Sequence, residues 1–167
     1  SADPVPVALI VDDKSKDYGA ALPELTVSYT GLVNGDTEPV MPPVIETACL
    51  ETSPVGTYPI TASGAADANY AISYVEGALT VDPVALTIIA DDKSKDYGAA
   101  LPELTVSYTG LVNGDAEPAT PPTIATTCEA ASPVGTYPIT AVGAADVNYA
   151  ISYVEGALTV DPVALTI

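Results

Sequence analysis

Histidine, arginine, tryptophan and phenylalanine are absent from this sequence, and its only basic residues are Lys14, Lys16, Lys93 and Lys95. Aspartate and glutamate number 22, which gives a formal net charge of −18 at pH 7. Nucleic acids and anionic membrane surfaces attract proteins mainly through lysine and arginine. No apolar run approaches the roughly 20 residues of a membrane-spanning helix. We therefore expect no nucleic-acid partner and no membrane insertion by this fragment.

The lack of histidine also bears on catalysis. Without it the commonest general acid–base group is missing, and a cysteine or serine nucleophile lacks its usual partner. Carboxylates are plentiful, but on so acidic a chain they are expected to be solvated surface groups, and so are the lysines. The sequence therefore predicts a protein that is not an enzyme and has no catalytic or cofactor-binding residue.

A long internal repeat dominates what is present. Cys49 and Cys128 are separated by 79 positions, as are Tyr18 and Tyr97. When residues 12–88 are aligned with 91–167, eleven of the 77 pairs differ. Long repeats of this kind indicate arrays of similar structural units.

The repeat divides the chain into unit 1 at residues 4–82 and unit 2 at 83–161, and residues 162–167 match the first strand of a following repeat. Only Asp82-Pro83 separates the last predicted strand of unit 1 from the first of unit 2. Proline fixes its own φ and keeps the preceding residue out of the helical region. We interpret Asp82 and Pro83 as an interdomain seam that holds the units end to end as a rod.

The 16 prolines and 12 glycines indicate many short strands joined by turns rather than helices. In unit 1 we expect a first strand at 7–11 and a polar loop at 12–19. A second strand follows at 25–30, where apolar residues alternate, and Asn34-Gly35-Asp36 is a strong turn signal. The expected fold is all-β, with about six or seven short strands per unit, as a small β-sandwich or a β-grasp-like sheet.

The segment Val44 to Leu50 shows which residues face the core. Its even-numbered positions differ between the repeats, whereas Ile45, Thr47 and Cys49 do not. Since alternate residues of a strand face opposite sides, we expect Ile45 and Cys49 to point inward.

Three more strands are expected in the second half of the unit. Residues 57–62 contain Pro59, which has no N–H, so this strand should lie at an edge or be bonded on one side there. Residues 69–74 and 78–81 are predicted to form an antiparallel hairpin around Glu76-Gly77.

The MBG-type repeat is resembled by an ordered set of motifs: Tyr18-Gly19, Leu22-Pro23, Leu32-Val33-Asn34-Gly35-Asp36, Val55-Gly56-Thr57-Tyr58-Pro59-Ile60, Asn69-Tyr70 and Gly77-Ala78-Leu79-Thr80-Val81. The resemblance covers essentially every residue of both units. It implies a small, mostly β domain that occurs in tandem in large bacterial surface and secreted proteins, many of them adhesin-like. It brings no catalytic residue with it.

Each unit has a single cysteine. Equivalent residues of consecutive rigid units lie roughly 30 Å apart for about ten strand residues, whereas a disulfide needs Cα atoms within about 7 Å. We therefore predict that Cys49 and Cys128 are buried free thiols, and an interchain disulfide remains the alternative. Some repeats of the family carry a second cysteine where this chain has Ala62 and Ala141, so an intradomain disulfide is out of reach.

A calcium site at the seam is a weaker candidate. If the predicted hairpin is antiparallel, Asn69 and Asp82 lie at one pole of unit 1. Asp67 and Glu155 would then be close enough to complete an oxygen-rich site of the kind that binds Ca²⁺. The spacing matches no known loop motif, so solvated acids are the default interpretation and no cofactor is assigned.

The preferred function is a structural stalk or spacer in a bacterial extracellular, cell-surface protein, with neighbouring repeats of the same chain as its partners. One alternative is an adhesion module that binds a host or matrix ligand, with the differing residues of 37–52 as a diversified strip. Another is a subunit of a self-assembling extracellular fibre, in which strands such as 163–167 are exchanged between chains.

Overall fold

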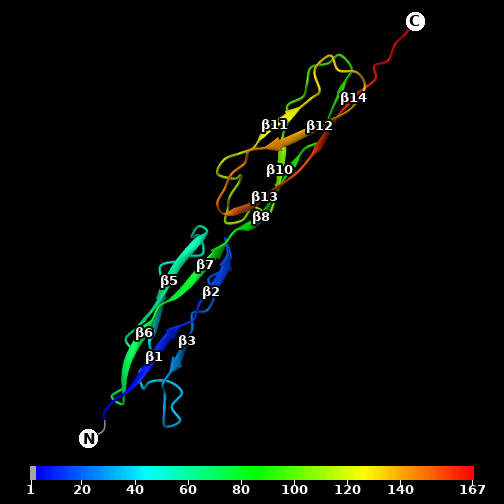
Figure 1. Ribbon diagram of the computed structural model, residues 1–167. Coiled ribbons are helices and arrows are strands. Elements are labelled where there is room, and N and C mark those ends of the chain that lie inside the picture. Colours follow the sequence, from blue (N-terminus) through cyan, green and yellow to red (C-terminus); the bar gives the residue numbers. More distant parts are fainter. Residues whose placement is uncertain (1–2) are drawn as a thin grey trace. The chain divides into compact units, whose positions relative to one another are not determined.

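The computed structural model describes residues 3–167, and every regular element in this part of the chain is a β-strand. There are 14 strands, seven in each of two compact units that divide between Asp82 and Pro83 (Figure 1). The prediction of an all-β fold with two tandem domains is confirmed. Among residues 3–167 there is no helix that is long and apolar enough to cross a membrane.

The strands recur in the same order in both units. Those of unit 1 are β1 (Val5–Val11), β2 (Lys14–Asp17), β3 (Val27–Thr30), β4 (Val44–Thr47), β5 (Gly56–Ser63), β6 (Tyr70–Val75) and β7 (Gly77–Asp82). Those of unit 2 are β8 (Val84–Ala90), β9 (Lys93–Asp96), β10 (Val106–Thr109), β11 (Thr123–Thr126), β12 (Gly135–Val142), β13 (Tyr149–Val154) and β14 (Gly156–Asp161).

Each unit contains two sheets rather than the single sheet of a grasp-type fold. In unit 1 a three-stranded sheet has the order β3-β1-β6, and a four-stranded sheet has the order β2-β7-β5-β4. Unit 2 repeats both orders, as β10-β8-β13 and β9-β14-β12-β11. The central strands β1 and β8 are rich in valine, leucine and isoleucine, which suits strands with neighbours on both sides.

The predicted hairpin of residues 69–74 and 78–81 is wrong. β6 and β7 do not pair, because β6 lies parallel to β1 in one sheet and β7 lies parallel to β2 in the other. Only Glu76 separates them, so the chain continues forward from one sheet into the next instead of reversing. In the β1–β6 and β2–β7 pairings, the two residues of every pair are the same number of positions apart in the sequence, from Val5↔Tyr70 to Asp17↔Asp82.

The two long parallel segments are residues 5–17, which contain β1 and β2, and residues 70–82, which contain β6 and β7. Both segments change the face that points to the core at the same register. Val7, Leu9 and Val11 are buried in β1, whereas after Asp12-Asp13 the buried residue of β2 is Lys16. The buried residues of the partner segment change from even to odd numbers between β6 and β7. Because side chains alternate along a strand, a one-residue shift of this kind moves the core to the other face.

The buried side chains form small clusters within each unit. In the three-stranded sheet of unit 1, Val7, Leu9 and Tyr70 are buried together, with Tyr29 and Ile72 packed against them. In unit 2 a cluster of Ala90, Cys128, Ile139, Leu158 and Val160 packs the four-stranded sheet against the end of β8. Each small core is therefore built mainly from aliphatic side chains, as a sequence without phenylalanine or tryptophan requires.

Two further expectations need correction. The polar run 12–19 is not only a loop, because Lys14–Asp17 forms β2 against β7. Of the two placements expected for the strand with Pro59, the edge position is wrong, because β5 lies inside the four-stranded sheet. The alternative is confirmed, because at Pro59 the strand pairs with β7 alone. Pro59 is tolerated because β4 ends at Thr47, opposite Ile60, so no strand residue needs an N–H from position 59. Thr47 Oγ1 instead donates to the Pro59 carbonyl at 2.9 Å.

Residues 162–167 form no strand and are exposed, with Leu165 at 89% and Ile167 at 115% of full exposure. The identical residues of unit 2, 84–88, lie in β8 between β10 and β13. The segment 162–167 pairs with no strand of the described chain, so its apolar side chains remain in solvent.

Candidate functional site

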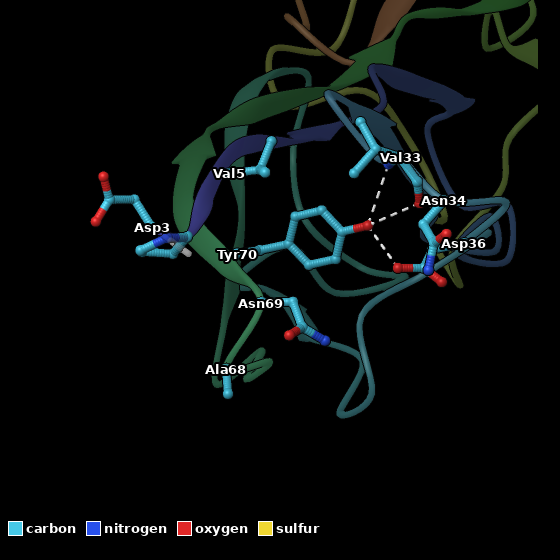
Figure 2. A pocket seen from close by; sticks show the side chains of 9 residues that line it. Asp3, Val5, Val33, Asn34, Asp36, Ala68, Asn69 and Tyr70 are labelled. Atoms are coloured by element: carbon cyan, nitrogen blue, oxygen red, sulfur yellow. Dashed lines mark hydrogen bonds between the residues drawn. The ribbon is translucent and has the colours of Figure 1, made fainter. Parts of the chain in front are cut away.

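Unit 1 has a surface pocket beside Tyr70, with a volume of about 300 Å³. Figure 2 shows the Tyr70 ring between Val5 and Asn69, with its hydroxyl directed at the turn that contains Val33 and Asp36. Tyr70 Oη lies 2.5 Å from Asp36 Oδ2 and 3.0 Å from the Val33 carbonyl, and it accepts from Val33 N at 3.1 Å. A phenol has only one proton to donate, and the Asp36 carboxylate is a stronger acceptor than the Val33 carbonyl.

This hydroxyl fixes the turn that the sequence signalled. Asn34 and Gly35 both have positive φ, 61° and 78°, and Asp36 N donates to the Val33 carbonyl at 3.1 Å. The hydrogen bond to Asp36 raises the pKa of Tyr70 above its ordinary value, because the carboxylate stabilises the neutral phenol. Tyr149 Oη makes the same contact in unit 2, 2.6 Å from Asp115 Oδ2. The pocket therefore contains a structural tyrosine rather than an activated one.

The seam residues are held by hydrogen bonds within their own units. The Asp82 carbonyl accepts from Tyr18 N at 2.9 Å in unit 1. Val84 N donates to the Asn148 carbonyl at 3.0 Å in unit 2. Strand β7 ends at Asp82 and β8 begins at Val84, so Pro83 is the one residue between two paired strands.

The geometry assumed for a calcium site at the seam is wrong. Because β6 continues into β7, Asn69 and Asp82 lie at opposite ends of a segment and not at one pole. Glu155 lies between β13 and β14, where the chain passes from one sheet of unit 2 to the other. Asp67 is engaged locally, since its Oδ1 accepts from Asn69 N at 2.9 Å and its Oδ2 from Val40 N at 3.0 Å. Residues 3–167 contain no cluster of three or more acidic, cysteine or histidine side chains suited to a metal ion.

The structure places both cysteines in the interior as free thiols, with Cys49 at 1% and Cys128 at 2% exposure. The pattern that pointed to Cys49 is regular in the structure, because Val44 and Glu46 are exposed while Ile45 is half-buried. Cys128 packs among aliphatic side chains of the four-stranded core. In this setting the thiol fills space as a small apolar group.

One buried residue of each unit was not expected from the sequence. Lys16 is only 7% exposed, and its Nζ donates to the Glu51 carbonyl at 3.1 Å. Lys95 is also 7% exposed and donates to the Ala130 carbonyl at 3.2 Å. The view that all lysines are solvated is therefore wrong for these two, whose ammonium groups tie β2 and β9 to the turn after the cysteine. The apolar–polar pattern gave no signal for this, since lysine rarely lies inside.

A pair of aspartates holds the point where the chain crosses between the sheets. Asp12 accepts from Thr26 Oγ1 and Ser28 Oγ, both at 2.7 Å, and these hydrogen bonds lower its pKa. Asp13 Oδ1 accepts from Ala78 N at 2.9 Å, across the parallel pair. Unit 2 repeats these contacts with Asp91 and Asp92. Asp12 therefore fixes the start of β3 beside the end of β1, and Asp13 joins the two long parallel segments.

Comparison with known proteins gives one family for both units. The family model described as MBG domain (YGX type) matches residues 7–80 and again residues 86–159. Each match runs from the first strand of a unit to its last. No curated protein matches the chain.

Proposed function

The chain belongs to the YGX-type MBG domain family, and from this we propose that its two tandem domains are a structural spacer in a bacterial extracellular, cell-surface protein. In this role the repeats hold another domain of the same protein away from the cell. Their partners are neighbouring repeats of the same chain. The proposal includes no catalysis, in keeping with a sequence that has no histidine.

The observation that carries the proposal is the one-residue connection between two paired strands. Tyr18 N fixes the Asp82 carbonyl on one side, and the Asn148 carbonyl fixes Val84 N on the other. Between them Pro83 has a fixed φ and restricts the residue before it. A flexible tether needs residues with free dihedral angles, as in glycine- and serine-rich linkers, and this connection has very few.

The composition supports the same role. A net charge of −18 keeps an extended array soluble and resists collapse through self-repulsion. Near-identical units also make an array whose length follows from the number of repeats, because each repeat is one structural unit. Both properties suit a spacer and need no ligand.

Small-angle X-ray scattering tests the proposal directly. Each unit should have a radius of gyration of about 12 Å, and two units in a fixed extended arrangement should give a narrow, elongated distance distribution. Replacing Asp82-Pro83 with a glycine- and serine-rich stretch should broaden this distribution while each unit keeps its melting temperature. A natural chain that is already broadly distributed or compact would contradict the spacer role.

Mass measurements separate the spacer from a self-assembling fibre. A spacer remains monomeric as its concentration rises, whereas exchange of strands such as 163–167 between chains would give a concentration-dependent mass. Light scattering over a range of concentrations distinguishes these outcomes.

A further inference from the structure

After the first strand, residues 12–82 and 91–161 differ at eleven positions, and all eleven are exposed in both units. Five further differences lie in β1 and β8, where three of the pairs are buried core residues. We call the eleven exposed positions the variable strip; in unit 1 they are Thr37, Val40, Met41, Val44, Glu46, Ala48, Leu50, Glu51, Thr52, Ser63 and Ala68. Exposure alone does not explain their location. Exposed residues on other elements, such as Ser15, Ser28 and Ala71, are the same in both repeats.

The variable strip follows one edge of the four-stranded sheet. Val44 and Glu46 are the exposed residues of β4, and Ser63 is the cross-strand partner of Val44 on β5. Met41 forms an isolated bridge with Ala66, and Val40 N is bonded to Asp67, which brings the approach to β4 against the loop before β6. Most of these eleven exposed differences therefore lie on β4 or in the segments next to it.

The apolar side chains of the strip lie at different positions in the two units: those within residues 40–50 belong to unit 1, whereas unit 2 has exposed Val142 and Val147 in place of Ser63 and Ala68. Val40, Met41, Val44 and Leu50 are 84%, 57%, 58% and 63% exposed. Their counterparts in unit 2 are Ala119, Thr120, Thr123 and Glu129, respectively. Four large apolar side chains exposed within residues 40–50 favour an interaction surface, because exposed apolar residues that occur singly are normal, whereas a group of them often marks an interaction site.

β4 also offers unpaired backbone and a hollow beside it. It is the terminal strand of the sheet, and no strand of the described residues pairs with its outer side. A hollow of about 330 Å³ lies on its exposed face, lined by Glu46, Thr47, Ala48, Pro59 and Thr61. The equivalent hollow in unit 2 has about 160 Å³ and has Ala125 in place of the glutamate.

Charge identifies the class of occupant. Both lysines of unit 1 lie on β2, at the opposite edge of the same sheet from β4. Carboxylates at Glu38, Glu46 and Glu51 flank the β4 edge in sequence. A second copy of the chain would add its own charge of −18 to this edge, whereas a basic segment would be attracted.

We propose that the outer edge of β4 in unit 1 binds an extended cationic peptide segment by β-strand addition. The segment pairs its main chain with β4. Its apolar side chains contact Met41, Val44 and Leu50, and a lysine or arginine enters the hollow beside Glu46. Main-chain pairing supplies affinity and the alternating side chains supply selectivity. Unit 2 does not bind this segment, because Thr120, Thr123 and Glu129 replace the three contacting apolar side chains and Ala125 replaces Glu46. Its exposed Val142 and Val147 lie at the end of β12 and before β13, not on β11.

The test uses the whole 167-residue chain and a capped peptide of four alternating lysine–valine pairs. Titration monitored by amide NMR should shift and protect Val44–Thr47 while leaving Thr123–Thr126 unchanged, so unit 2 is an internal control. Converting Met41→Thr, Val44→Thr, Glu46→Ala and Leu50→Glu gives unit 1 residues that unit 2 already carries in a folded domain. This variant should bind about tenfold or more weakly, because it loses apolar contact area and the acidic rim.

The reciprocal graft makes the proposal falsifiable in the other direction. Thr120→Met, Thr123→Val, Ala125→Glu and Glu129→Leu should confer binding on unit 2. A peptide whose alternate amides are N-methylated should lose affinity, since it cannot add as a strand. Equal shifts in both units, abolished by salt alone, would mean unspecific attraction to an acidic surface and would overturn the proposal. Pairing of β4 with a second copy of the chain would overturn it as well.

Discussion

Gly77 provides the sharpest test of how each unit is built. It begins β7, where the two long parallel segments cross between the sheets. A methyl group at this position would lie 2.7 Å from the Val11 carbonyl oxygen and 3.0 Å from that of Asp12. Both neighbours are backbone atoms of the paired segment, which cannot rotate away. At Gly156 the corresponding distance to the Ala90 carbonyl oxygen is 2.3 Å.

The expected magnitude follows from these distances. Non-bonded atoms rest at about 3.5–4.0 Å for carbon, so Gly77→Ala must push the segments apart by about half an ångström or more. Overpacking of this kind costs about 1–3 kcal/mol of unfolding free energy. At about 0.05–0.15 kcal/mol per residue, the whole stability of one unit is only about 4–12 kcal/mol. Since 1 kcal/mol shifts the melting temperature of a small domain by about 4–8 °C, we expect a fall of about 5–20 °C.

Gly56→Ala is the matched control. Gly56 begins β5 in the same sheet, and the nearest atom to an added methyl group is Tyr58 Cε2 at 3.8 Å, an ordinary contact. This substitution should be neutral or stabilise unit 1 by up to about 1 kcal/mol, because it restricts the unfolded chain. Differential scanning calorimetry of the full chain should show one of two similar transitions moving down for Gly77→Ala and neither for Gly56→Ala. Equal melting temperatures for the two variants would refute the close approach at the crossing.

Three further outcomes follow from the contacts of the units. Lys16→Met should lower the stability of unit 1 by about 1 kcal/mol in chemical denaturation, since the Glu51 carbonyl loses its donor; no change would mean that water replaces the ammonium group. Cys49 and Cys128 should react slowly with a thiol reagent in the native protein and rapidly in denaturant, and rapid native labelling would contradict their burial. The pKa of Asp12 is lowered from 3.8, chiefly by Thr26, so its contribution to stability is complete above about pH 3.8 and is lost as the pH falls through the lowered value. Asp12→Asn should therefore reduce the loss of unit 1 stability at acid pH. If the unfolding free energy falls with pH as in the natural chain, the hydrogen bonds of Asp12 are not coupled to folding.

Alternation of apolar and polar residues predicted the strands that have one face on the core and the other in solvent. The alternation around Cys49 predicted the exposed face of β4, and Asn34-Gly35 predicted a turn that has positive φ at both residues. These features depend on neighbours one to three positions apart, so they can be read directly from the sequence. The all-β class follows from the same kind of signal, whereas the repeat follows from comparing residues 79 positions apart.

Pairing between distant segments could not be predicted in this way. Glu76-Gly77 between two strand-like runs is typical of a hairpin, but its glycine is needed for the close approach of Val11, which lies near the start of the unit. The parallel pairing of β1 with β6 and of β2 with β7 has no local signature. Lys16 was missed for a related reason, because its acceptor is the Glu51 carbonyl, which belongs to a turn 35 residues away. The Tyr70 hydroxyl likewise finds Asp36 only through the fold.

The constant register between the long parallel segments has a mechanical consequence for a single unit. Its first strand begins beside Tyr70 and its last strand ends beside Asp17, so the two chain ends of the unit leave from opposite ends of one parallel pair. Tension applied to those ends slides the segments along each other and loads the main-chain hydrogen bonds of β1–β6 and β2–β7 together, in shear. An antiparallel terminal pair pulled at adjacent ends would instead open one bond at a time. Resistance to force depends on the unfolding rate rather than on equilibrium stability, so even a marginally stable unit of this topology can withstand a sustained pull.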